Sequence, residues 1–384
     1  MSRVLVEQEV FRWAVDRCGL TLDDLQPKFP KIHQWATGEA LPTLRDLEKL
    51  AKATFAPLGF FFFAEPPKER LPVPYFRTIG DEGPITPSPN LLESVQIMQR
   101  RQAWMREFLI EQGQERLRFV RSVQIEEQPA LVAERIRRTL AIDDGWAAAQ
   151  RTWTDALRVL RETMETAGIL VVVNTIVQNN THRKLNVDEF RGFVLVDEFA
   201  PVVFVNGADG KAAQMFTLAH ELAHVFFGSS AAFDLRQMQP ADDPMERACN
   251  RVAAEFLVPE QKLRGIWQSV KRDSEPFQTI AREFKVSVLV AARRALDLSL
   301  IDKAAFLKFY REYQHDERRT PPDRHKKPVF YPTQNLRIGR RFGSAVVRAA
   351  KEGKLLYSEA YRLTGLYGKT FDRYAASLGI GGIR

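Results

Sequence analysis

Two histidines and a glutamate stand close together in one apolar stretch of the sequence. The stretch reads Phe216-Thr217-Leu218-Ala219-His220-Glu221-Leu222-Ala223-His224, and its apolar spacing predicts a helix. Residues four apart share one helix face, so His220 and His224 could bind a single metal ion through their imidazole nitrogens. Glu221 would lie beside that ion, where it could take a proton from a bound water molecule. The pattern is typical of a metal-dependent hydrolase.

A third ligand is expected, because a catalytic zinc ion usually has three protein ligands and one open position. The stretch from Pro244 to Pro259 has a helical pattern bounded by prolines. Within it, Glu246 and Asn250 share one face, the spacing expected for a ligand and a side chain that supports the ligands. Glu255 is the alternative ligand, or else a solvent-exposed helix charge, and the spacing favours Glu246. Cys249 is off that face and is interpreted as a small core residue.

These stretches resemble the ImmA/IrrE family of metallopeptidases. The resemblance rests on Asn206, on the run from Phe216 to His224, and on the pattern Glu246-x-x-x-Asn250-x-x-Ala253-Ala254-x-Phe256-Leu257-x-Pro259. It covers roughly the region from Trp153 to Leu300.

The resemblance implies a zincin-like α+β core of the gluzincin type. His220, His224 and Glu246 would be its zinc ligands, and Glu221 its catalytic glutamate, with Asn250 behind the ligands. The implied activity is zinc-dependent endopeptidase cleavage of a cognate transcriptional repressor or similar regulator.

Two features of the expected active site stay open. No oxyanion stabiliser is identifiable; His182 is a candidate because histidines are few, and an ordinary loop histidine is the alternative. The segment from Val202 to Val205 could be an edge strand that pairs with an extended substrate, or an ordinary core strand.

The elements that position the metal-binding residues follow from the local patterns. We expect a helix from Trp153 to Thr166 and a buried strand from Ile169 to Val173. The segments from Phe193 to Val196 and from Val202 to Val205 read as a hairpin. Asp209 is the expected N-cap of the histidine helix and Gly228 its C-cap.

The pattern of the N-terminal segment, residues 1–65, predicts short helices. Its motif Ile32-x-x-Trp35-x-x-Gly38-x-x-x-Pro42-Thr43 resembles the Xre-type helix-turn-helix. Pro27 and Pro30 should shorten its second and third helices. Its 8 basic and 9 acidic residues provide no general attraction to DNA. Leu58 and Phe60–Phe63 are expected to seal the bundle. The candidate nucleic-acid contacts are Lys28, Lys31, His33 and Gln34.

The whole chain is expected to have four parts. Residues 66–150 form a linker and a helical connector, 151–299 the metallopeptidase domain, and 300–384 a basic helical region. The last part has 18 lysines and arginines against 8 aspartates and glutamates, so it carries a net charge of +10, against +8 for all 384 residues. Such a surface could contact DNA or an acidic protein partner.

The composition indicates the cellular compartment. The 2 cysteines, Cys18 and Cys249, form no close pair, which suits a reducing compartment. No secretory signal and no apolar run long enough to cross a membrane is recognisable, so we expect a cytoplasmic protein.

Two hypotheses therefore remain. The first is a zinc endopeptidase with regulatory helical appendages. The second is a non-proteolytic DNA-binding regulator or antitoxin-like protein whose metal site is only structural.

Overall fold

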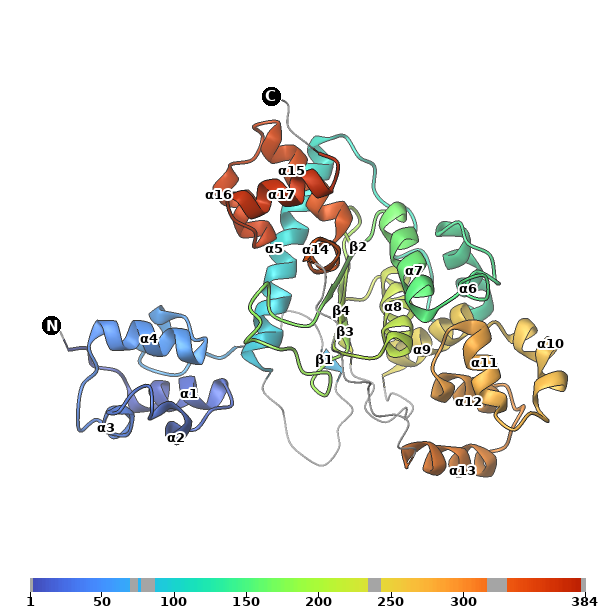
Figure 1. Cartoon of the computed structure of the whole chain (residues 1–384), viewed down its shortest axis with the longest axis horizontal. Coiled ribbons are helices and arrows are strands. Elements are labelled where there is room, and N and C mark those ends of the chain that lie inside the picture. Colours follow the sequence, from blue (N-terminus) through green and yellow to red (C-terminus); the bar gives the residue numbers. More distant parts are fainter. Residues whose placement is uncertain (1–2, 70–74, 77–86, 234–242, 316–329, 381–384) are drawn as a thin grey trace. The chain divides into compact units, whose positions relative to one another are not determined.

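The computed structural model describes residues 3–69, 75–76, 87–233, 243–315 and 330–380. The chain forms two compact units: Met1–Pro72 with Asp81–Gln96, and Val73–Gly80 with Ile97–Arg384. The fold is mixed α+β and mostly helical (Figure 1), which confirms the predicted class. Among the described helices, none is both long and apolar enough to cross a membrane.

The first unit contains short helices: α1 (Gln8–Arg17), α2 (Leu22–Leu25), α3 (Ile32–Thr37), α4 (Leu44–Thr54) and the 3-10 helix η1 (Leu58–Phe62). Capping boxes begin α2 and α4, because Thr21 and Thr43 exchange hydrogen bonds with the residues three further on. The brevity of α2 and α3 agrees with the predicted effect of the prolines. The sealing role expected for the aromatic run is only partly right: Phe61 is buried, whereas Phe62 and Phe63 are 55% and 47% exposed.

The second unit contains a five-stranded sheet. Its strand order is β1 (Tyr75–Phe76), β5 (Ala231–Phe233), β3 (Gly192–Leu195), β4 (Val202–Asn206) and β2 (Leu170–Asn174). Strands β3 and β4 pair antiparallel, as the predicted hairpin requires. Strand β4 also pairs in parallel with β2, with Asn206 opposite Asn174.

The interior position of β4 corrects one expectation. The segment from Val202 to Val205 is fully buried and has a strand on each side, so it cannot pair with a substrate as an edge strand. The β2 side of the sheet is itself covered by α14 (Phe330–Ile338), which packs along β2 (Figure 1). Gly339, which follows α14, makes that approach close: a Cβ atom there would lie 3.1 Å from the carbonyl oxygen of Val171.

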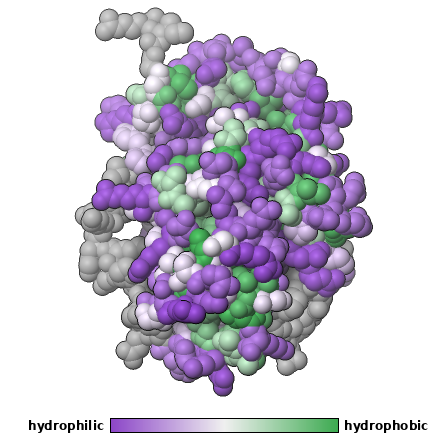
Figure 2. Space-filling view, turned by 90° about the vertical axis from the view of Figure 1, so that its right-hand side faces the viewer, coloured by the Kyte–Doolittle hydropathy of each residue, from purple (hydrophilic) through white to green (hydrophobic). Residues whose placement is uncertain are grey.

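Helices cover the sheet and extend the core. The central one is α8 (Lys211–Phe227), which packs against β3, β4 and α9 (Pro244–Leu257). The others in this region are α6 (Pro129–Thr139), α7 (Trp153–Ala167), α10 (Glu260–Val270), α11 (Pro276–Phe284), α12 (Val288–Asp297) and α13 (Lys303–Gln314). The face seen in Figure 2 is mainly hydrophilic, with small and separate apolar patches, as expected where apolar side chains are used in the core.

Of the two cap residues predicted for α8, one is confirmed and one is wrong. Gly228 adopts a left-handed conformation (φ 82°) and ends the helix, as expected. The predicted N-cap is wrong, because Gly210 takes that position instead of Asp209. The Asp209 carboxylate is used elsewhere: it pairs with Arg191 at 2.6 Å and accepts a hydrogen bond from the Gly210 amide.

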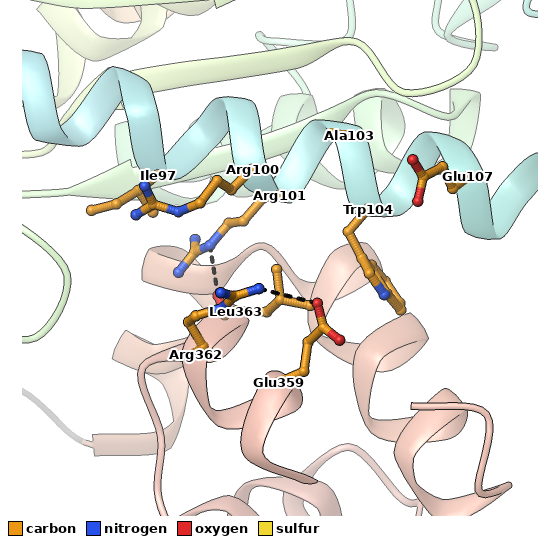
Figure 3. Close-up of a pocket in the computed structure, with 9 residues that line it drawn as sticks. All are labelled: Ile97, Arg100, Arg101, Ala103, Trp104, Glu107, Glu359, Arg362 and Leu363. Carbon is orange, nitrogen blue, oxygen red and sulfur yellow. Dashed lines mark hydrogen bonds and ion pairs between the residues drawn. The ribbon is translucent and has the colours of Figure 1, made fainter. Parts of the chain in front are cut away.

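Helix α5 (Pro89–Glu111) runs through the connector, and its part from Ile97 onward belongs to the second unit. On one face, Gln102 donates hydrogen bonds to the carbonyl oxygens of Leu195 and Ala200, on either side of the β3–β4 turn. On another face, α5 meets the C-terminal helices (Figures 1 and 3). These are α15 (Arg340–Lys351), α16 (Tyr357–Thr364) and α17 (Lys369–Ser377).

Candidate metal centre

Helices α8 and α9 bring His220, His224 and Glu246 together. The Nε2 atom of His220 lies 3.1 Å from Oε2 of Glu246, and the Nε2 atom of His224 lies 3.0 Å from Oε1 of the same carboxylate. The two Nε2 atoms are 3.1 Å apart. Two histidines one helical turn apart and a glutamate from the facing helix therefore present their ligand atoms to one point.

This arrangement fits a divalent metal ion. A tetrahedral zinc site with bonds of about 2.0–2.1 Å has ligand atoms about 3.3 Å apart, close to the separations found here. Two imidazole nitrogens and a carboxylate are a donor set that zinc commonly takes. Burial lowers the pKa of His220, which favours the neutral ring that a metal ligand requires. Burial opposes ionisation of Glu246, but the hydrogen bonds from both histidines hold its pKa well below the ordinary value.

Asn250 supports one of the ligands. Its Oδ1 atom lies 3.0 Å from Nδ1 of His220, so the amide oxygen can accept a hydrogen bond from that ring nitrogen. With a metal ion bound, a proton at Nδ1 would leave the lone pair of Nε2 free for the metal, in place of the Nε2 hydrogen bond to Glu246. One turn of α9 thus separates the carboxylate ligand from the residue that orients a histidine.

Glu221 lies next to the cluster and is fully buried. Neither of its carboxylate oxygens has a hydrogen-bond partner within the described residues. Burial, and secondarily the negative charge of Glu246, raise the pKa of Glu221 well above its ordinary value. A carboxyl group in this environment holds a proton readily and can exchange it with a neighbouring group.

Gly192, the first residue of β3, allows the sheet to approach this glutamate. A Cβ atom on it would lie 2.6 Å from Cγ2 of Thr217, 2.8 Å from the carbonyl oxygen of Phe204 and 3.1 Å from Oε1 of Glu221. Sequence reasoning missed this residue. The available signal was a glycine at the start of an apolar strand, which often marks a close backbone approach.

Glu255, the alternative third ligand, is not part of the cluster. It forms an ion pair with Arg294 of α12, and it accepts a hydrogen bond from the amide of Glu260. Only 7% of the residue is exposed, so its interpretation as a solvent-exposed charge is wrong. Cys249 is buried in the core, and burial raises the pKa of its thiol.

Other residues singled out in the sequence lie apart from the three ligands or have local roles. Asn206 is buried at the end of β4, where it donates to the carbonyl oxygen of Phe190 and accepts from the amide of Ala208. His182 is exposed in a loop, and no contact within the described part of the chain links it to the ligands.

The candidate nucleic-acid contacts Lys28, Lys31, His33 and Gln34 are exposed around α3 in the first unit. His33 lies 3.1 Å from the Asp23 carboxylate, which adds negative charge to that surface. DNA binding through them remains a prediction.

The comparisons with known proteins point to the same region. Residues 164–296 match the family model of the IrrE N-terminal-like domain, Peptidase_M78. This match supports the ImmA/IrrE resemblance. It spans the end of α7 through most of α12 and includes both histidines, Glu221, Glu246 and Asn250.

A second match, over residues 338–377, is to a domain of unknown function (DUF8813) that contains α15, α16 and α17. No curated protein and no solved structure matches the chain. The domain at 164–296 thus suggests a metallopeptidase-like function at the level of the family.

Proposed function

We propose that this protein is a zinc-dependent endopeptidase in which Glu221 is the general base. His220, His224 and Glu246 hold the metal, and Asn250 orients His220. The observation that carries the proposal is the buried carboxylate of Glu221, without a hydrogen-bond partner among the described residues, beside a three-ligand cluster.

The three-ligand cluster and Glu221 together favour catalysis over a structural metal site. A structural zinc ion is normally held by four protein ligands, whereas a catalytic one has three and an open position. A buried carboxyl group without a hydrogen bond lowers the stability of the fold. A structural site has no need of such a group, but a hydrolase needs it to move a proton.

The chemistry follows from these roles. Zinc bound by the three side chains would bring the pKa of a coordinated water to about 7 and polarise the substrate carbonyl group. Glu221 takes the proton from the attacking water and later gives it to the leaving nitrogen. Its burial keeps solvent protons away from the carboxyl group between these two transfers.

For the substrate, we propose a transcriptional repressor or a similar regulator in the cytoplasm. This choice follows from the ImmA/IrrE resemblance of the sequence, and the match to the IrrE N-terminal-like domain supports the metallopeptidase class alone. The two cysteines, which are free thiols in the structure, are compatible with a reducing compartment.

The test is incubation of the purified protein with repressors encoded by neighbouring genes. Wild type with stoichiometric zinc should produce defined fragments, and Glu221→Gln should retain zinc but produce none. A purified protein that binds no zinc would refute the metal site. Cleavage that persists in Glu221→Gln would exclude Glu221 as the base. A protein whose regulatory effect survives Glu221→Gln without any cleavage would support the structural-metal alternative.

A further inference from the structure

A cavity separate from the metal centre lies in the second unit, in a groove between α5 and α16 (Figure 3). Its volume is about 210 Å³, equivalent to about seven molecules of liquid water. None of its lining residues belongs to α8 or α9, so the groove is separate from the metal centre. Its α16 side lies within the domain of unknown function at residues 338–377.

A buried cation forms part of the groove wall. Arg101 is 5% exposed, and its guanidinium donates to the carbonyl oxygens of Leu363 and Arg337, at 2.9 and 3.0 Å. These carbonyl groups end α16 and α14, where helix dipoles provide only partial negative charge. No described carboxylate pairs with Arg101. Burial lowers its pKa to about 10, so the side chain still carries its charge at neutral pH.

The charges around the groove are unevenly placed. Arg100 immediately precedes the buried cation in α5, is exposed, and has no ion-pair partner among the described side chains. Arg362 forms an ion pair with Glu359 at 3.2 Å, so its charge already has a partner. Glu107 lies at the far end of the groove (Figure 3), about 10 Å along α5 from Arg100, since a helix rises 1.5 Å per residue. One end is therefore basic, with two guanidinium groups that lack a carboxylate.

The middle of the groove is suited to an apolar group. Leu363 lines it and the indole of Trp104 forms one side, whereas Ile97 lies beside Arg100 at the basic end. The Trp104 ring is held in place because it stacks on Phe108 at 5.2 Å and meets the edge of Phe342. A ring fixed in this way offers a preformed surface to a small flat molecule.

We propose that this groove binds a small organic anion, a carboxylate or a phosphate monoester on a compact apolar body. The guanidinium groups of Arg100 and Arg101 receive the anionic oxygens, because arginine donates paired N–H groups in the geometry that carboxylates and phosphates accept. The apolar body lies against Trp104 and Leu363. Such a site gives the α15–α17 region a ligand-binding role that does not depend on the proposed peptidase activity.

The test is calorimetric titration of the full-length protein with three probes of similar size: benzoate, phenyl phosphate and the neutral benzamide. At least one anion should bind at least about tenfold more tightly than benzamide, since a charge-assisted hydrogen bond is worth at least a factor of ten. The two anions distinguish a carboxylate site from a phosphate site. Failure of both to bind at millimolar concentration, or equal binding of benzamide, overturns the proposal.

Three variants place the binding in the groove. Arg100→Ala should weaken anion binding about tenfold or more, whereas Arg348→Ala, which removes an exposed arginine of α15 outside the groove, should leave it unchanged. Ala103→Trp adds bulk at an exposed lining position and should abolish binding while retaining both arginines. Circular dichroism checks that each variant is folded. Equal losses in Arg100→Ala and Arg348→Ala would indicate general charge attraction and refute a defined site.

Discussion

The amide oxygen of Asn250 lies 3.0 Å from Nδ1 of His220, while Nε2 of the same ring lies 3.1 Å from the Glu246 carboxylate. Helix α9 therefore contacts both ring nitrogens of His220: Asn250 lies at Nδ1, and the ligand Glu246 lies at Nε2. The Asn250 amide therefore helps to set the orientation of the ring and the direction of the Nε2 lone pair.

Replacement of Asn250 by alanine should therefore weaken metal binding without removing a ligand. Loss of such a supporting hydrogen bond typically lowers metal affinity by roughly 10- to 100-fold. Competition with a chromophoric chelator would measure the change. Asn250→Asp, which keeps an acceptor oxygen at this position, is the matched variant and should retain more of the affinity. Equal affinity in wild type and Asn250→Ala would show that the amide does not orient the ligand.

Replacement of Glu221 by glutamine should separate catalysis from metal binding. The change keeps the size of the side chain but removes the proton acceptor, so peptide cleavage should fall by about 100- to 10,000-fold. Zinc stoichiometry should be unchanged, because Glu221 is not among the three clustered ligand residues. The melting temperature should not fall, since the carboxyl group has no hydrogen bond to lose within the described residues.

Glu198→Gln is a suitable control for that experiment. Glu198 pairs with Arg116 at a largely exposed site, so cleavage and stability should both remain close to wild type. A comparable loss of cleavage in the control would mean that the Glu221 effect is not specific.

Local spacing was enough to predict the helix that carries the histidines and that Glu246, rather than Glu255, lies with them. A period of 3.6 residues fixes which side chains share a face, and the structure brings His220, His224 and Glu246 to one point. The β3–β4 hairpin was predictable for the same reason, because both strands and their turn are adjacent in the sequence.

What the sequence left open depends on contacts between distant segments. Val202–Val205 is an interior strand only because β2 pairs along its other side. Glu255 is buried rather than exposed because Arg294, from α12, neutralises it. The prediction of Asp209 as the N-cap of α8 was wrong because its carboxylate pairs with Arg191. Neither periodicity nor capping preference contains information about partners of this kind.

The ion pair between Glu255 and Arg294 leads to a prediction about stability that does not depend on the metal. Both side chains are about nine-tenths buried, so Arg294→Met leaves a buried carboxylate without its partner. The free energy of unfolding should fall by about 3–5 kcal/mol, as measured by urea denaturation. The double variant Arg294→Met with Glu255→Leu should recover most of that loss, because it removes the unpaired charge as well. A zinc content that falls in Glu255→Leu would contradict the assignment of this glutamate as a structural residue.

The approach of β3 to α8 leads to a prediction for Gly192. A methyl group there would lie 2.6 Å from Cγ2 of Thr217 and 2.8 Å from the carbonyl oxygen of Phe204. The strand and the helix must therefore separate in Gly192→Ala, which should lower the free energy of unfolding by about 1–3 kcal/mol.

Because Glu221 lies on the same contact, Gly192→Ala should also reduce kcat for peptide cleavage more than the stability loss alone explains. Gly265→Ala in α10 is the matched control, since that glycine is exposed and nothing lies within 4 Å of its added Cβ atom. It should be neutral or slightly stabilising, because alanine favours the helix more than glycine does. If Gly192→Ala were as well tolerated as Gly265→Ala, close packing of β3 would not be what positions the Glu221 carboxylate.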